Sequence, residues 1–259
     1  MEFKFSTKDI VFSVVVILAI FFQDAGIKFI VGNFINKDFF TSLPEEYRLL
    51  IIQVIGWVFC LIVLFFLAQF SLTKAREMLG FDKGFTVPAV YATFSCLPML
   101  MGYAIVHGLQ PGITFKTIFL YSIWPGFSEE IIFRLFLMGI LVRYANWNFI
   151  LAALLSALLF AKNDLCQAHN FIEGCKILIA VSGAGLGFAV LCRMWNWNVW
   201  FTVLMHVLMN LSVVLFIPHN SVLLNTTDPL FRGTTIFFAI VVTIFYRIMS
   251  FKKNADSGS

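Results

Sequence analysis

The sequence predicts an all-α polytopic membrane protein, with about eight transmembrane helices that enclose a polar cavity within the bilayer. Of the 259 residues, 60% are hydrophobic and only 12% are charged, about half the charged fraction of a typical soluble domain. The mean hydropathy is +0.91. The apolar residues are gathered into runs of about 20, the length at which a helix crosses a hydrocarbon core of ~30 Å.

Each apolar run is expected to form one transmembrane helix, because the runs are continuously apolar and lack the alternation of a membrane β-barrel. No low-complexity linker or internal repeat separates them, so we expect residues 1–259 to form a single membrane domain. The eight expected spans are residues 10–31, 49–70, 86–107, 116–142, 148–165, 176–195, 198–217 and 230–249.

The distribution of basic residues predicts the orientation of these spans. With eight spans, both termini lie on the same side of the membrane. Ten lysines and arginines fall on that side and six, including Arg232, fall on the other. Because cytoplasmic loops carry the excess of Lys and Arg, we expect both termini in the cytoplasm. The length and compactness of the chain favour a bacterial cytoplasmic (inner) membrane.

The five cysteines form no CxxC or Cys/His spacing typical of a zinc site. Cys166 and Cys175 flank the connection between the fifth and sixth spans. In an oxidising compartment a disulfide could form there, and two free thiols fit the sequence equally well. No basic tract indicates a nucleic-acid partner.

The most informative feature is a group of charged residues inside the fourth apolar run, FLYSIWPGFSEEIIFRLFLMGIL. A charge in hydrocarbon costs at least ~2.5 kcal/mol, so it seldom persists without a function. Glu130 and Arg134 are one helical turn apart and are expected to pair. This pairing leaves Glu129 to face a polar cavity, where it could accept a proton from water as a general base. The alternative is an ion pair that only fixes helix packing.

The seventh run, FTVLMHVLMNLSVVLF, supplies a second polar group at a similar depth. His206 and Asn210 are four residues apart, so they share one helix face near the middle of the bilayer, as Glu129 does. Their N–H groups could stabilise an oxyanion, or the side chains could bind a metal ion. The alternative is a histidine that hydrogen-bonds to a neighbouring helix.

These motifs resemble a known family of membrane proteases. The motif EEIIFR (Glu129 to Arg134) is followed by an apolar span that ends in a Phe-initiated motif at Phe160, and then by HVLMN (His206 to Asn210). This order resembles the CAAX prenyl endopeptidases and bacteriocin-processing enzymes, also called the CPBP or Abi family. The resemblance covers residues 120–217, and the count of eight spans is similar to that family's fold.

The resemblance implies an intramembrane endopeptidase that hydrolyses peptide bonds of hydrophobic, lipidated or membrane-associated peptides. It implies that Glu129 activates the attacking water and that Glu130 supports it and pairs with Arg134. His206 and Asn210 would stabilise the tetrahedral oxyanion. In a bacterium, the substrates could be peptide precursors or membrane-protein tails rather than prenylated proteins.

The chain departs from the family pattern at the middle motif. There the family has Phe, three residues and then a His, which helps the first Glu to activate water. This chain reads FAKND, so Asp164 stands at the position of that His. A carboxylate can accept a proton or bind a metal, but it cannot donate and accept at once as an imidazole does. His169, five residues further on, is a second candidate for the missing role.

Three questions therefore stay open at the level of the sequence. Glu129, Asp164 and His206 could together bind Zn²⁺ through N and O ligands, but catalysis by glutamate alone fits as well, so no cofactor is certain. The loss of the histidine also fits an impaired member of the family that regulates a membrane partner. A proton-coupled transporter is a weaker alternative, because no inverted repeat is visible.

Overall fold

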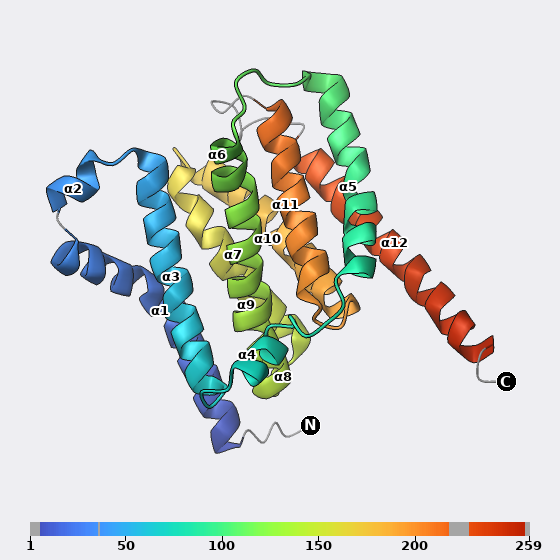
Figure 1. Ribbon diagram of the computed structural model, residues 1–259, viewed down its shortest axis with the longest axis horizontal. Helices are drawn as coiled ribbons and strands as arrows, with labels where there is room; N and C mark the ends of the chain where they lie inside the picture. Colours follow the sequence, from blue (N-terminus) through green and yellow to red (C-terminus); the bar gives the residue numbers. More distant parts are fainter. Residues whose placement is uncertain (1–5, 36, 218–227, 257–259) are drawn as a thin grey trace. The chain divides into compact units, whose positions relative to one another are not determined.

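The computed structural model describes residues 6–35, 37–217 and 228–256, and within them every regular element is a helix (Figure 1). Helices occupy all eight expected spans, so the all-α fold class is confirmed. The long elements are α1 (Thr7–Phe34), α3 (Glu45–Leu67), α5 (Thr86–His107), a continuous helical run over 115–144, α9 (Phe149–Lys162), α10 (Phe171–Met194), α11 (Val199–Phe216) and α12 (Asp228–Asp256), with the short α2 (Lys37–Ser42) and α4 (Leu72–Met78) between them.

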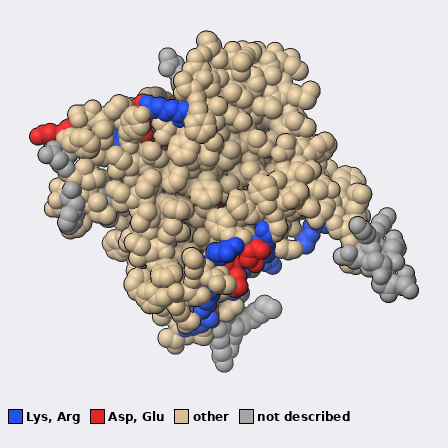
Figure 2. Space-filling model, viewed as in Figure 1, with Lys and Arg blue, Asp and Glu red and all other residues tan. Residues whose placement is uncertain are grey.

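Long apolar helices with exposed apolar side chains identify an integral membrane protein. Many large apolar side chains on the helices are exposed, among them Ile105, Ile179 and Phe245, as expected of a surface that meets lipid. On the face drawn in Figure 2, charged residues occupy only small patches. In the described part of the chain, five stretches are long and apolar enough to cross a membrane: Glu46–Leu67, Thr86–His107, Phe171–Met194, Val199–Phe216 and Leu230–Phe251.

The helical run that carries the glutamates has unusually wide turns. It consists of α6 (Phe115–Ile118), η1 (Phe119–Ile123), α7 (Trp124–Glu129), η2 (Glu130–Gly139) and α8 (Ile140–Tyr144). In η1 and η2 the hydrogen bonds follow the i→i+5 pattern of a π-helix, which is rare and is often found at functional sites. Wide turns lie on both sides of Pro125, which has no N–H for the ordinary helical bond.

The chain forms two compact units, described separately here. Unit 1 consists of Met1–Asp82 and Ser128–Ser156, and unit 2 of Lys83–Phe127 and Ala157–Ser259. In unit 1, α1 packs against α3, and η2 contacts α1, α3 and α4. In unit 2, α11 contacts α5, α10 and η1, while α12 packs against α5 and α10. The glutamates therefore lie in unit 1, and the histidine motif lies in unit 2.

In unit 1, the segment after η2 is fixed at two points. Arg143 of α8 donates a hydrogen bond to the carbonyl of Met78 at the C-terminal end of α4, where a cation is favourable. Further along, Asn146 donates to the Asp9 carboxylate (3.0 Å) and Trp147 donates to the Ser13 hydroxyl (2.8 Å), both on α1. These contacts hold the end of the glutamate helix.

In unit 2, the turn that precedes the histidine helix is also fixed. Trp195 stacks on Phe201 with ring centroids 4.5 Å apart, and its indole N–H donates to Thr243 of α12. Asn196 and Trp197 have φ angles of 52° and 63°, uncommon for residues with a side chain. The contacts of Trp195 with Phe201 and Thr243 therefore hold this turn and the start of α11 in place.

Of the two cysteines that flank the connection between α9 and α10, Cys175 carries a free thiol. The side chain of Cys166 lies outside the described residues.

Candidate active site

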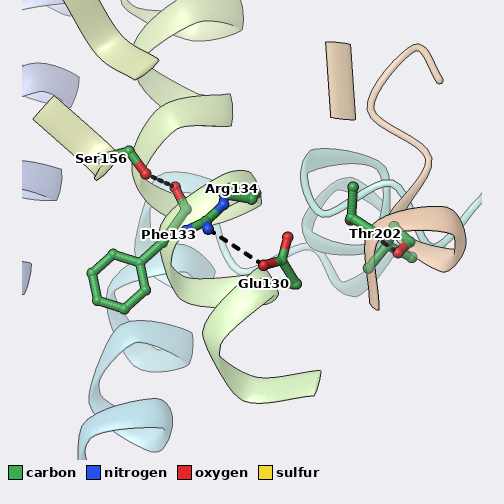
Figure 3. Close-up of polar contacts among 6 residues, drawn as sticks. Glu130, Phe133, Arg134, Ser156 and Thr202 are labelled. Atoms are coloured by element: carbon green, nitrogen blue, oxygen red, sulfur yellow. Dashed lines mark hydrogen bonds and ion pairs between the residues drawn. The ribbon is translucent and has the colours of Figure 1, made fainter. Parts of the chain in front are cut away.

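The first group of candidate residues, in unit 1, contains the buried pair of Glu130 and Arg134. An Nη of Arg134 lies 3.6 Å from an Oε of Glu130, and the side chains of Arg134 and Glu130 are 1% and 0% exposed. Figure 3 shows the guanidinium directed towards the carboxylate from the next turn of η2. The predicted pairing is therefore confirmed. In this environment the two charges neutralise each other, which is the condition for keeping either of them away from water.

The helix around this pair is buried on every side. All residues from Glu130 to Gly139 are buried. The Ser156 hydroxyl of α9 donates a 2.7 Å hydrogen bond to the Phe133 carbonyl (Figure 3). This bond fixes the backbone one residue before Arg134.

Glu129 differs from its neighbour in its environment. It is the last residue of α7 and is half-buried, whereas Glu130 is completely buried. Successive residues of an α-helix are rotated by about 100°, so the two carboxylates point in different directions. Two adjacent carboxyl groups thus have separate surroundings, the arrangement that lets one serve structure and the other chemistry.

A second group of candidate residues, in unit 2, lies on the face of α11 that carries His206. The imidazole is 9% exposed and lies against two phenyl rings, with centroids 5.2 Å away at Phe188 of α10 and 6.4 Å away at Phe160 of α9. Asn210, one turn further along α11, is half-buried. The apolar walls reduce competition from water, which strengthens any hydrogen bond that the imidazole makes.

The middle motif lies beside this histidine. Asp164 is in η3 (Asn163–Gln167), a 3₁₀ turn that continues α9, and Gln167 donates a 3.1 Å hydrogen bond to its carboxylate. Phe160, one helical turn before Asp164, has its ring centroid 6.4 Å from that of His206, so the middle motif and the histidine face meet within unit 2.

His169 lies elsewhere, on the exposed connection between η3 and α10. Its backbone N–H donates a 2.8 Å hydrogen bond to the Glu173 carboxylate in the first turn of α10. Its side chain is exposed. The backbone of His169 thus helps to fix the start of α10. The catalytic role suggested for its side chain stays a prediction.

In unit 2, the start of the glutamate helix makes close contact with α11. Ser122 donates a 2.8 Å hydrogen bond to the carbonyl of Val207, the residue after His206. A Cβ added at Gly126 would lie 2.7 Å from the backbone N of Val207, closer than side chains normally approach. Only glycine therefore fits at position 126 without a shift of one of the two helices.

Within the part of the chain that the structure describes, no three His, Cys, Asp or Glu side chains are grouped closely enough to hold a metal ion. The zinc ligand set of Glu129, Asp164 and His206 stays a prediction from the sequence.

Comparison with known families gives one match. Residues 111–212 match the family model described as type II CAAX prenyl endopeptidase Rce1-like. The matched segment contains both glutamates, Asp164 and the histidine motif, and it ends before Arg232. No curated protein and no solved structure matches the chain.

Proposed function

We propose that the chain is a protease of the CAAX endopeptidase type, which hydrolyses peptide bonds of hydrophobic, lipidated or membrane-associated peptides through a water activated by Glu129; the match of residues 111–212 to the family model supports this. The observation that carries the proposal is that one family match spans both polar motifs, Glu129 to Arg134 and His206 to Asn210. These motifs lie in different parts of the sequence and have no other evident reason to occur together.

The first step of the proposed reaction is attack by water on the peptide carbonyl. The Glu129 carboxylate takes a proton from the water as its oxygen bonds to the carbonyl carbon. The buried pairing of Glu130 with Arg134 supports this assignment, because it leaves Glu129 as the half-exposed carboxylate of the two. Proton transfer by a positioned carboxylate contributes typically about 10²–10⁴-fold to a rate.

The second step stabilises and then breaks the tetrahedral intermediate. The carbonyl oxygen becomes an oxyanion, which accepts hydrogen bonds from the His206 imidazole and the Asn210 amide. Glu129 then gives its proton to the amide nitrogen as the C–N bond breaks, so the products are a carboxylate and an amine. No acyl-enzyme forms.

In the proposed reaction, side chains of the chain itself carry out each step. Asp164 takes the position of the family's middle histidine.

The presence of Asp164 in place of the family's middle histidine favours a second candidate function, regulation of a membrane partner. A chain that lost the middle histidine could bind a membrane partner and regulate it without cleaving it. Such a protein would need neither the charge nor the proton affinity of Glu129.

The two functions are separated by Glu129→Gln in protein reconstituted into liposomes. The probes are a farnesylated peptide with a C-terminal CAAX sequence and an unprenylated apolar peptide, with new termini detected by mass spectrometry. We expect the variant to lose at least about 100-fold in cleavage rate because the base is removed. Glu77→Gln, on an exposed position of α4, is the matched control and should cleave as the unaltered protein does.

Cleavage at an unchanged rate by the Glu129→Gln variant would remove Glu129 from the mechanism. If the unaltered protein cleaves neither probe, while its effect in cells survives the same substitution, the regulator is the correct function.

A further inference from the structure

The backbone of α11 accepts a side-chain hydrogen bond at the residue before His206 and at the residue after it. The Ser122 hydroxyl of η1 donates to the carbonyl of Val207 over 2.8 Å. The Cys96 thiol of α5 donates to the carbonyl of Met205 over 3.6 Å. Both donors are buried, Ser122 at 0% and Cys96 at 3% exposure. Neighbouring elements therefore hold α11 at the level of the histidine.

The two donors belong to different elements that pack against α11. Cys96 lies on α5 and Ser122 on η1, and both elements contact α11 within unit 2. Successive residues of an α-helix are rotated by about 100°, so the carbonyls of residues 205 and 207 are about 200° apart around the helix axis. The two hydrogen bonds thus reach α11 from nearly opposite sides, which restrains its rotation about that axis.

His206 points to a third side of the same helix. It follows residue 205 and precedes residue 207, so it is turned by about 100° from each. This side is covered by Phe188 of α10 and Phe160 of α9, whose ring centroids lie 5.2 Å and 6.4 Å from that of the imidazole. Asn210 shares this face, one turn further along. The place of both candidate oxyanion donors therefore depends on the rotation of α11.

A bond from a serine to another helix is one of two possibilities for a buried hydroxyl. Serine in a helix often donates to a carbonyl of its own preceding turn. Ser95 and Ser212, both 0% exposed, do this, since they donate to Tyr91 and Leu208 of their own helices over 2.7 Å and 2.9 Å. Ser122 instead uses its hydroxyl to join η1 to α11.

We propose that Ser122 and Cys96 are positioning residues of the active site, which fix the rotation of α11 and so the place of the His206 imidazole. This inference rests on the proposed function and names two further residues of the same site. Side chains end about 5–6 Å from a helix axis, so a rotation of about 10° moves the imidazole by about 1 Å. A misplacement of about 1 Å can cost about 100-fold in rate.

The two bonds are not expected to contribute equally. A carbonyl oxygen has two lone pairs, so each carbonyl can accept the side-chain donor in addition to its bond within the helix. In hydrocarbon, no water replaces a donor that is lost. A thiol is a weaker donor than a hydroxyl, so the Ser122 bond should restrain α11 more strongly than the Cys96 bond.

The inference is tested by steady-state cleavage of the farnesylated CAAX peptide in liposomes. We expect Ser122→Ala to lower kcat by roughly 10-fold with little change in KM, because the imidazole acts on the oxyanion and not on the unreacted peptide. Cys96→Ala should lower kcat by only about 3-fold. The double variant should lose roughly 100-fold, more than the product of the two, because in each single variant the remaining bond still restrains α11.

The matched controls remove the same groups where they join no second helix to α11. Ser212→Ala removes a buried hydroxyl from α11 itself, and Cys60→Ala removes a thiol that is 3% exposed in unit 1. Both should leave kcat unchanged. Equal losses of kcat in Ser122→Ala and Ser212→Ala would overturn the proposal, because any buried hydroxyl would then have the same effect. An unchanged kcat in the double variant would also overturn it.

A second measurement keeps the test independent of proteolysis. The chain has four histidines, and the imidazole ¹H resonances of His206 can be assigned by comparison with His206→Gln. The phenyl rings beside His206 make these resonances sensitive to its position. We expect Ser122→Ala and the double variant to shift them, and Ser212→Ala to leave them in place.

The two measurements together separate the inference from the proposed function. A protein that cleaves neither peptide probe but shows these shifts would contradict the proposed function and retain the inference. Unshifted resonances in the double variant of a protein that cleaves the peptide would contradict the inference alone.

Discussion

Two adjacent glutamates have different surroundings because successive residues of a helix point in different directions. Glu130 is buried with Arg134 at 3.6 Å, and Glu129 is half-buried one residue earlier. A buried ion pair gains little net stability over an apolar pair, but removing one partner leaves a charge without compensation. The Glu130–Arg134 pair is thus more sensitive to a single substitution than to a joint one.

The first prediction concerns the stability of this pair. Arg134→Met should lower the free energy of unfolding by about 3–5 kcal/mol, the cost of leaving one partner of a buried pair charged and alone. The double variant Glu130→Gln/Arg134→Met should regain much of that loss. Unfolding in detergent micelles measures both, with Arg76→Met on an exposed position of α4 as the control. A single variant as stable as the double variant would contradict the assigned role.

At the scale of elements, residues 122–126 and α11 are in close contact within unit 2. Gly126 lies against the backbone of Val207, and the Ser122 hydroxyl donates a hydrogen bond to the carbonyl of the same residue. The two contacts fix the level of residues 122–126 relative to α11. Helix packing of this kind depends on a small residue at the crossing point.

The second prediction uses two glycines with different surroundings. Gly126→Ala places a methyl group 2.7 Å from the Val207 backbone N, so one helix must shift at a cost of about 1–3 kcal/mol. We expect this variant to lose both stability and peptide cleavage.

Gly183→Ala on α10 is the matched control, because a Cβ there meets nothing within 4 Å. It should be neutral or slightly stabilising, since alanine favours a helix by up to about 1 kcal/mol over glycine. Equal behaviour of the two alanine variants in unfolding and cleavage assays would show that the close approach at Val207 has no consequence.

At the scale of the whole molecule, apolar periodicity predicted the positions of the helices well. The third span was expected at residues 86–107 and α5 is Thr86–His107; the seventh was expected at 198–217 and α11 is Val199–Phe216. Spans are set by local composition, which the sequence contains directly. The second span ended earlier than expected, at Leu67, because Gln69 and Phe70 adopt positive φ angles.

Contacts between candidate side chains were predictable only where the two residues are close in the sequence. The Glu130–Arg134 pair follows from their spacing on one helix, and it was correctly predicted. The contact of Phe160 with His206 depends on how the end of α9 packs against α11, which no local pattern encodes. The wide turns of η1 and η2 were also missed, since the sequence suggested only a bend near Pro125 and Gly126.

The third prediction tests the number and direction of the spans. If all eight helices cross the membrane with both termini in the cytoplasm, a fluorescent protein fused after residue 259 should fold and fluoresce. The same protein fused after residue 168, between α9 and α10, should be dark, and alkaline phosphatase fused there should be active. Fluorescence at position 168 would mean that one of the helices before it does not cross.

The π-helical geometry of η2 limits how the chain can change in length during evolution. Ten residues with i→i+5 hydrogen bonds occupy fewer turns than they would in an α-helix. Loss of one residue there must be taken up by conversion of wide turns to ordinary helical turns; if the wide turns persist, it rotates everything beyond the deletion relative to the glutamates by roughly 100°. Homologues should therefore tolerate many substitutions of apolar type across 131–139 but almost no insertions or deletions.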